Sequence, residues 1–234
     1  MYFFNPIYFI IVLPAMLFAF YAQAAVSSAV SRASKLRSSR GLTGREVAEQ
    51  ILAAGGLSDV RVERTRGGRG LGDHYDPRSR TIRLSPQIFD RPSVAAMGIA
   101  AHEAGHALQH ARGYTFLLVR NGLFPVVQFA SGLAFPLFIA GLIFASTSRL
   151  GLGLMDLGIV LFFAAVVFQI ITLPVEYNAS SRAVAALGDL GLVAGEETVA
   201  ARRVLNAAAL TYVAATAAAL AQLLYLLVLR GRRD

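Results

Sequence analysis

Three residues within a stretch of five near the middle of the chain have the types and the spacing of a metal-dependent hydrolytic site. His102, Glu103 and His106 form the pattern His-Glu-x-x-His. On a helix, residues four apart lie on one face with Cβ atoms about 5–6 Å apart, so both imidazoles can point at one Zn²⁺. Glu103 is rotated by one position, where its carboxylate can act as general base on a metal-bound water. The pattern therefore predicts zinc-dependent hydrolysis, although two histidines can also share a helix face without a metal.

A helix must position these three side chains, and the flanking residues predict one. Ser93 follows Pro92 as a plausible N-cap, and residues 94–111 contain no proline. Gly105 lies inside this helix, where it costs about 1 kcal/mol relative to alanine. We therefore expect another backbone, or a substrate, to pass close to Gly105.

Composition restricts both the ligands and the class of protein. The 234 residues are 56% hydrophobic, which is typical of a membrane protein, and they include no cysteine. A zinc ion must therefore be held by His, Asp or Glu. The net charge of +8 flanks apolar segments, so it favours orientation in a lipid bilayer, and we expect no nucleic-acid partner.

Apolar runs divide the chain and predict about four transmembrane helices, at 7–30, 122–145, 154–175 and 207–229. The last run is weaker and could instead be a buried helix. The expected organisation is a membrane anchor, a catalytic part, a membrane hairpin, a polar helical segment and a final helix with a basic tail, at residues 1–30, 31–118, 119–175, 176–206 and 207–234.

The catalytic part is expected to be a small α+β unit. A capping box at Thr43–Glu46 begins a helix that ends at Gly55. Residues 60–64 and 81–84 alternate like strands, and we expect 81–84 to present a free edge to an extended peptide. The predicted fold class is thus a mainly α membrane protein with a cytoplasmic zincin-like catalytic unit built on the His-Glu-x-x-His helix.

The distribution of positive charge predicts the orientation. Segments 31–121 and 176–206 carry 18 of the 22 Lys and Arg residues. The positive-inside rule places these segments in the cytoplasm. We therefore expect a multi-pass protein of the bacterial cell (inner) membrane with its active site on the cytoplasmic face.

A third metal ligand is expected directly after the third apolar run. Glu176 follows Pro174, and the topology returns it to the membrane face that holds the histidines. Two histidines and one glutamate form a known catalytic zinc set, although a helix-start carboxylate can also simply complement the helix dipole. His110 is an alternative third ligand, but it lies about 12 Å along the helix from His102.

Several stretches of the chain resemble membrane zinc peptidases. The order of His-Glu-x-x-His, membrane hairpin and Glu176-Tyr177-Asn178-Ala179 is similar to membrane gluzincins of the CAAX-prenyl endopeptidase and HtpX type. Those use Glu-Phe-x-Ala-Asp, and Ser180 stands here in place of that Asp. The chain more closely resembles the YugP-like family of neutral zinc metallopeptidases of bacterial membranes. The matching stretches are residues 43–48, 73–77, 100–109, 173–180 and 206–214.

The resemblance implies a role for the residues at the centre of these motifs. His102, His106 and Glu176 would bind one Zn²⁺ per chain, and Glu103 would activate water. Asn178 and Ser180 are candidates for orienting a ligand.

Three further residues are candidates with two interpretations each. His74 and Tyr75 either form a turn or donate hydrogen bonds to a substrate. Arg182 either forms a surface ion pair or contacts a carboxylate or a substrate carbonyl.

The sequence thus favours an integral membrane zinc metalloendopeptidase, a protease that hydrolyses membrane-associated or unfolded proteins by a zinc-bound water activated by Glu103. The alternative is a metal-binding membrane scaffold or adaptor with little hydrolytic activity. The intact Glu103 argues against the scaffold, because a structural metal site needs no base. A zinc lipase or amidase is a weaker option.

Overall fold

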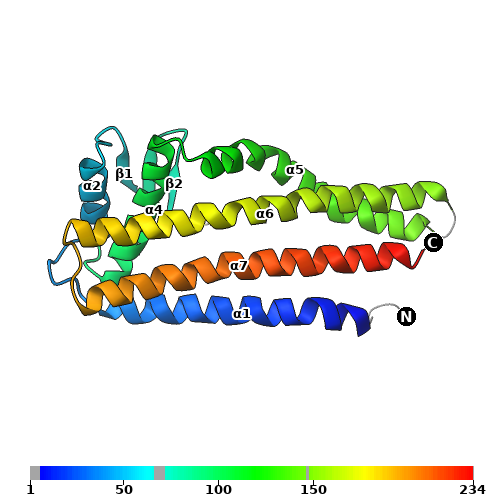
Figure 1. Cartoon of the computed structure of the whole chain (residues 1–234), viewed down its shortest axis with the longest axis horizontal. Helices are drawn as coiled ribbons and strands as arrows, with labels where there is room; N and C mark the ends of the chain where they lie inside the picture. Colours follow the sequence, from blue (N-terminus) through cyan, green and yellow to red (C-terminus); the bar gives the residue numbers. More distant parts are fainter. Residues whose placement is uncertain (1–5, 66–71, 146–147, 234) are drawn as a thin grey trace. The chain divides into compact units, whose positions relative to one another are not determined.

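The computed structural model describes residues 6–65, 72–145 and 148–233. The helices are α1 (Pro6–Lys35), α2 (Gly44–Ala54), α3 (Pro86–Phe89), α4 (Val94–Ala111), α5 (Thr115–Phe144), α6 (Arg149–Asp189) and α7 (Glu196–Gly231) (Figure 1). The strands are β1 (Arg61–Arg64), β2 (His74–Asp76) and β3 (Thr81–Leu84). The chain forms two compact units, the first from Met1–Ala22, Leu118–Leu173 and Thr211–Asp234 and the second from Gln23–Leu117 and Pro174–Leu210.

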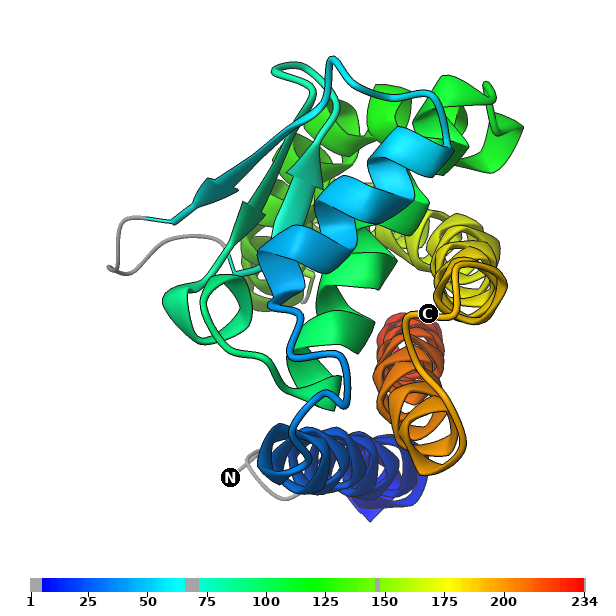
Figure 2. The same cartoon turned by 90° about the vertical axis from the view of Figure 1, so that its left-hand side faces the viewer.

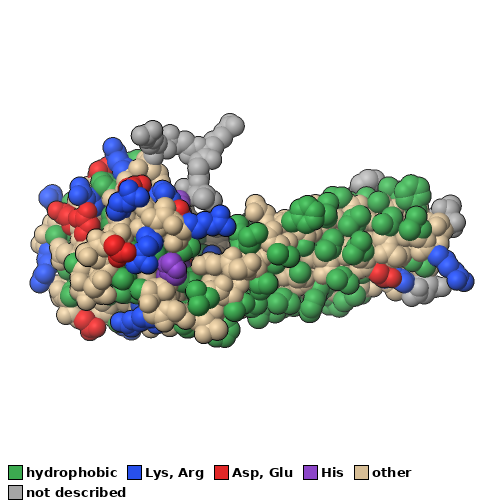
Figure 3. Space-filling model, turned by 90° about the horizontal axis from the view of Figure 1, so that it is seen from above, with side chains coloured by type: hydrophobic (Ala, Val, Ile, Leu, Met, Phe, Trp, Pro, Cys, Tyr) green, Lys and Arg blue, Asp and Glu red, His purple; other side chains and the backbone are tan. Residues whose placement is uncertain are grey.

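The first unit consists of the most apolar parts of the long helices. In the described part of the chain, α1, α5, α6 and α7 are the four helices long and apolar enough to cross a membrane, by length and composition. Large apolar side chains such as Ile10, Phe129 and Val160 are exposed on this unit. Figure 3 shows hydrophobic side chains gathered over it and most charged side chains over the second unit. The expectation of about four apolar helices with a small mixed unit is therefore met.

Helix α6 differs from the prediction at Pro174. We expected the third apolar run to end there and Glu176 to begin a new helix, but α6 continues without interruption from Arg149 to Asp189. A proline inside a helix removes one backbone hydrogen bond and can be tolerated where neighbouring groups compensate. Glu176 is consequently an interior helix residue, so the helix dipole does not explain its presence.

The second unit is built around a three-stranded sheet and the helices beside it (Figure 2). Helix α2 begins with the expected capping box, in which Thr43 and Glu46 bond each other's backbone N–H groups, and its C-cap is Gly55. The strand order is β1-β3-β2, with β1 parallel and β2 antiparallel to β3. The prediction that residues 81–84 present a free edge is therefore wrong, because β3 is the central strand.

Burial explains why β3 is central. Thr81, Ile82 and Leu84 have no exposed surface, whereas all three residues of β2 are partly exposed. Strand β3 can bury its side chains only where neighbours cover it, so the shorter and more polar β2 lies at an edge.

Helix α4 is the central element of the second unit. It has the predicted bounds, and the hydroxyl of its N-cap Ser93 accepts a hydrogen bond from Ala96 N–H at 3.3 Å. Most of its residues are buried, including Ala100, Ala104 and Ala107. Small side chains let other elements approach closely, and they do so on several sides of α4 (Figure 2).

Helix α6 approaches α4 closely at Gly105. A Cβ atom placed on Gly105 would lie 2.5 Å from the backbone oxygen of Ala179. The expectation that another backbone passes beside Gly105 is therefore met. This contact fixes the part of α6 that carries Glu176 against the part of α4 that carries the two histidines.

Candidate metal centre

Three side chains converge where α4 and α6 touch. Nε2 of His102 lies 3.2 Å from Oε2 of Glu176, and Nε2 of His106 lies 3.6 Å from the same oxygen. The candidate ligand atoms of all three residues lie within 4.8 Å of one another. Glu176 is only 1% exposed and His106 only 8%, while His102 is partly exposed. The structure thus brings together the three residues proposed from the sequence as metal ligands.

The hydrogen bonds of Gln109 fix which nitrogen of His106 is free. The Nε2 amide group of Gln109 donates to the backbone oxygen of Val175 at 2.7 Å and to Oδ1 of Asn178 at 3.0 Å. Its oxygen, Oε1, is therefore the atom that faces Nδ1 of His106, at 3.0 Å. An amide oxygen only accepts, so Nδ1 of His106 carries the hydrogen and Nε2 keeps its lone pair.

His102 contacts Ser180, whose hydroxyl can either donate or accept a hydrogen bond. The Oγ atom of Ser180 lies 3.2 Å from Nδ1 of His102, on the opposite side of the ring from Glu176. With the hydrogen on Nδ1, the serine oxygen accepts and Nε2 is again left with its lone pair. In this tautomer both histidines present Nε2 to the same point, each supported from behind by a neutral oxygen, as is usual for histidines that bind metals.

The donor set fits a zinc ion. Two neutral imidazoles and one carboxylate form a set that catalytic zinc sites use, with a further position left for water or substrate. The ligand atoms are close enough together for one ion to replace the direct contacts among them. Burial of Glu176 beside two neutral rings is otherwise costly, because a buried carboxylate needs a compensating positive charge.

Glu103 lies beside the three ligands and is oriented by strand β2. The backbone N–H of Tyr75 donates to Oε2 of Glu103 at 2.9 Å. The pKa of Glu103 is raised to about 7, chiefly by burial and in smaller part by the negative charges of Glu176 and Asp73, while His102 and the hydrogen bond from Tyr75 oppose the rise. A carboxyl group with such a pKa can both accept and return a proton near neutral pH.

His74 and Tyr75, for which a turn was one interpretation, lie instead in strand β2 and have defined partners. The hydroxyl of Tyr75 and Nδ1 of His110 are 2.9 Å apart, which holds β2 against the end of α4. Nδ1 of His74 lies 2.7 Å from the backbone oxygen of Gly72. His110 is therefore turned toward Tyr75, and the cluster that could hold a metal in the described chain does not include it.

Asn178 and Arg182 lie two and six residues after Glu176 on α6. Oδ1 of Asn178 accepts from Gln109 and also from Nε of Arg182, at 2.7 Å. Arg182 forms no ion pair among the described residues, which differs from the surface ion pair considered above. Asn178 supports Gln109 rather than a metal ligand directly.

Two residues of this site were given no individual role from the sequence. Gln109 connects His106 to α6, and its position three residues after His106 on the same helix face is the signal that could have found it. Asp73 contributes to the charge around Glu103 and accepts a hydrogen bond from Ser85 N–H at 2.5 Å. No simple spacing rule links Asp73 to α4.

Comparisons with known proteins identify the family of the chain. Residues 8–231 match the model of a family described as "Putative neutral zinc metallopeptidase". The chain is 46% identical over 229 residues to a protein of Bacillus subtilis (strain 168) named "Putative membrane protease YugP", a match that covers 97% of this chain and 99% of that relative. No solved structure matches the chain. The similarity spans both units and includes the three candidate ligands.

Proposed function

Because the chain belongs to the family of neutral zinc metallopeptidases, we propose that it is an integral membrane zinc endopeptidase of the gluzincin type. Its substrates would be membrane-associated or unfolded proteins. The observation that carries the proposal is the convergence of two Nε2 atoms and one carboxylate beside the separate, buried carboxyl group of Glu103.

His102, His106 and Glu176 would hold the zinc ion, one per chain. When bound there, Zn²⁺ supplies a Lewis acid that lowers the pKa of water and polarises a substrate carbonyl. Gln109 keeps the imidazole of His106 in the tautomer that offers Nε2, and Ser180 contacts Nδ1 of His102 on the side of the ring away from Glu176. The contact of Gly105 with Ala179 fixes the position of Glu176 along α4, beside His102 and His106.

Glu103 would move the proton. Its Oε2 is held by the Tyr75 N–H, so we assign proton transfer to Oε1. Glu103 accepts a proton from the water that attacks the peptide carbonyl, and it returns this proton to the departing amine. The pKa of about 7 suits both directions of transfer, because neither protonation state is strongly disfavoured at neutral pH.

Strand β2 replaces β3 as the expected docking edge for a peptide. Within the described sheet, β2 pairs only with β3. The backbone N–H of Tyr75, in β2, donates to the carboxylate of Glu103. An extended peptide that adds to this edge would place its backbone beside the general base.

The orientation in the membrane is part of the proposal. The second unit carries 17 of the 22 Lys and Arg residues, together with all of the proposed catalytic residues. The positive-inside rule supports a cytoplasmic location for this unit in the bacterial cell (inner) membrane.

The test compares protease activity and zinc content in three purified proteins. Wild type should contain about one Zn²⁺ per chain and cleave an unfolded protein substrate. Glu103→Gln should keep its zinc and lose activity, because Glu103 contacts water and not the metal. Glu176→Ala should lose both, since a ligand is removed.

The pattern of these results separates the alternatives. Equal activity in wild type and Glu103→Gln would refute the proposed hydrolysis. Zinc retention without any protease activity in wild type would instead support the metal-binding scaffold. Full zinc retention in a His102→Ala, His106→Ala double variant would show that the metal lies elsewhere.

A further inference from the structure

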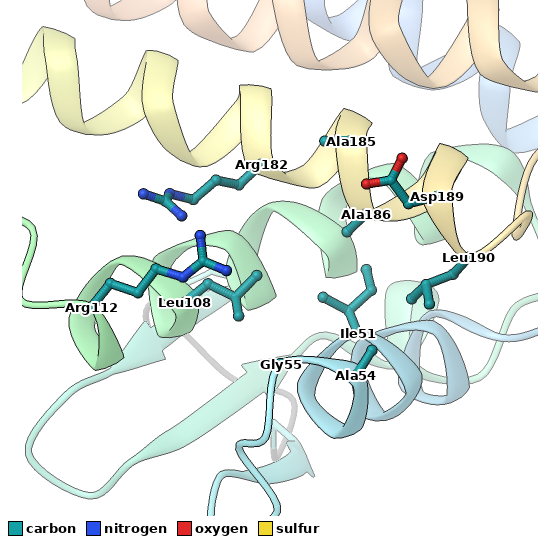
Figure 4. A pocket seen from close by; sticks show the side chains of 10 residues that line it. All are labelled: Ile51, Ala54, Gly55, Leu108, Arg112, Arg182, Ala185, Ala186, Asp189 and Leu190. Carbon is teal, nitrogen blue, oxygen red and sulfur yellow. The ribbon is translucent and has the colours of Figure 1, made fainter.

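A second site in the same unit shares no lining residue with the metal centre. An open pocket of about 270 Å³ lies between the end of α2, the end of α4 and the last turns of α6 (Figure 4). Its walls are mostly apolar, with Ile51, Leu108 and Leu190 among them, and its charged residues are Arg112, Arg182 and Asp189. All of these residues belong to the second unit.

Two guanidinium groups lie at the same end of this pocket. Figure 4 shows the side chains of Arg112, the C-cap of α4, and Arg182, from α6, extending toward each other. Their positive charges act on each other. Like charges at short range cost free energy unless an anion offsets the repulsion.

No carboxylate offsets these charges in the described chain. Neither Arg112 nor Arg182 forms a salt bridge within residues 6–65, 72–145 and 148–233. Asp189 lies seven residues after Arg182 on α6, about 10 Å further along the helix axis, and lines the other end of the pocket.

Arg182 is already oriented for an anion. Its Nε donates to Oδ1 of Asn178 at 2.7 Å, which uses one of its five N–H groups. The side chain is partly buried, so its remaining Nη donors are held near the pocket. An arginine with a fixed stem loses less conformational entropy when it binds a ligand.

We propose that Arg112 and Arg182 form a binding site for a phosphate group. Two planar guanidinium groups that converge from different helices match the several oxygens and the negative charge of phosphate. The apolar wall of Leu108, Ile51 and Leu190 next to them would accommodate a hydrocarbon stem attached to that phosphate. The phosphate could come from a lipid headgroup or be free in solution, and the experiment separates these sources.

The pocket lies behind the metal centre. Arg112 is nine residues after Glu103 on α4, which places the two on opposite faces of the helix. The only connection described between the two sites is the chain of hydrogen bonds from Arg182 through Asn178 and Gln109 to His106. The phosphate site goes beyond the proposed peptidase activity, and its occupancy can be measured without any substrate.

The test measures phosphate binding to the full-length protein in a maltoside detergent, which contains no phosphate. Radiolabelled inorganic phosphate is titrated in equilibrium dialysis at constant ionic strength. We expect Arg112→Gln and Arg182→Gln each to weaken binding about tenfold, because each removes charge-assisted hydrogen bonds. Arg91→Gln is the matched control, since Arg91 is exposed, lies in the same unit and does not line the pocket.

A gain-of-binding variant guards against damage to the fold. Asp189→Asn removes the negative charge of the pocket and should tighten phosphate binding about twofold to threefold. Thermal unfolding of each variant in detergent shows whether it is folded. Unchanged binding in both arginine variants, or an equal loss in Arg91→Gln, would overturn the proposal, as would a failure of wild type to bind any phosphate probe.

Short-chain lipids identify the source of the phosphate. Dihexanoyl phosphatidylglycerol and dihexanoyl glycerol differ only in the phosphate-containing headgroup. Displacement of labelled phosphate by the first lipid at lower concentration than by unlabelled phosphate assigns the site to a lipid headgroup, and the reverse order assigns it to free phosphate. Equal displacement by acetate, or by the lipid that lacks phosphate, would contradict phosphate recognition.

Discussion

Replacement of Gly105 by alanine tests how the two halves of the metal centre are held together. The new Cβ would lie 2.5 Å from the backbone oxygen of Ala179, 3.2 Å from its carbonyl carbon and 3.3 Å from its Cα. These are backbone atoms and cannot rotate away. Because nonbonded heavy atoms prefer separations of about 3.5 Å or more, α4 and α6 must move apart by roughly 1 Å at this point.

The displacement acts directly on the ligands. Glu176 lies one helical turn before Ala179, and His102 and His106 flank Gly105. A metal site tolerates deviations of about 0.2 Å in ligand distance, so a shift of roughly 1 Å should lower zinc affinity at least tenfold. Overpacking should also destabilise the protein by about 1–3 kcal/mol, or about 2–4 °C in Tm for each kcal/mol.

Gly98 provides the matched control on the same helix. A Cβ placed there would meet only atoms of Ala201 at 3.8 Å, which is an ordinary contact. Gly98→Ala should therefore gain up to about 1 kcal/mol from helix propensity and leave zinc affinity unchanged. Zinc affinity is measured by competition with a chelator and Tm by circular dichroism in detergent. If Gly105→Ala binds zinc like wild type and its Tm rises as in Gly98→Ala, the contact with α6 does not set the ligand geometry.

Two further predictions concern single contacts, and a third concerns the membrane orientation. Gln109→Ala should lower zinc affinity about 10–100-fold in chelator competition, because the imidazole of His106 loses its support, and unchanged affinity would refute that role. Hydrogen bonds from Ser79 and then Arg83 lower the pKa of Asp76 from 3.8 to about 2, so its ionised form stabilises the fold above pH 4 and this contribution is lost as the pH falls toward 2. Asp76→Asn should accordingly have a lower Tm than wild type at pH 7, with the difference narrowing below pH 4; a constant difference would contradict the assignment. A single cysteine at Ser58 or Glu196, in a chain that has none of its own, should resist an impermeant maleimide applied to whole cells, and labelling from outside at either position would reverse the proposed orientation.

The helices could be predicted because their signals are local. Ser93 and the absence of proline after it give the bounds of α4, and the capping box at Thr43 gives the start of α2. The spacing of His102 and His106 needs nothing beyond helix geometry. Glu176 needed the additional argument that two apolar runs return the chain to the same side.

The strand order could not be predicted in the same way. Strand β3 pairs in parallel with β1, which ends 17 residues earlier, and in antiparallel fashion with β2. Local alternation identifies a strand but does not say which strand lies between the others, because that depends on long-range packing against α2 and α4. The expectation of a free edge on β3 failed for this reason.

The side-chain hydrogen bonds around the ligands could not be predicted from the sequence either. Gln109 bonds residues 66 and 69 positions away, and Arg182 shares its acceptor. The position of α6 along the axis of α4 decides which of their side chains meet. The contact at Gly105 sets this position. The sequence does not give the relative position of α4 and α6, so an ion pair was a reasonable expectation for Arg182.

The amide of Gln109 has a consequence for the chemical ageing of the protein. Both of its N–H groups donate, and its oxygen accepts from His106. Deamidation would give a glutamate of nearly the same size that has no N–H group, and its negative charge would face the oxygens of Val175 and Asn178. Gln109 is fully buried, which keeps water from its amide in the folded protein. We therefore expect deamidation of Gln109 mainly in chains that stay unfolded for long periods, during synthesis or storage. In such chains His106 would lose its support although the backbone stays intact.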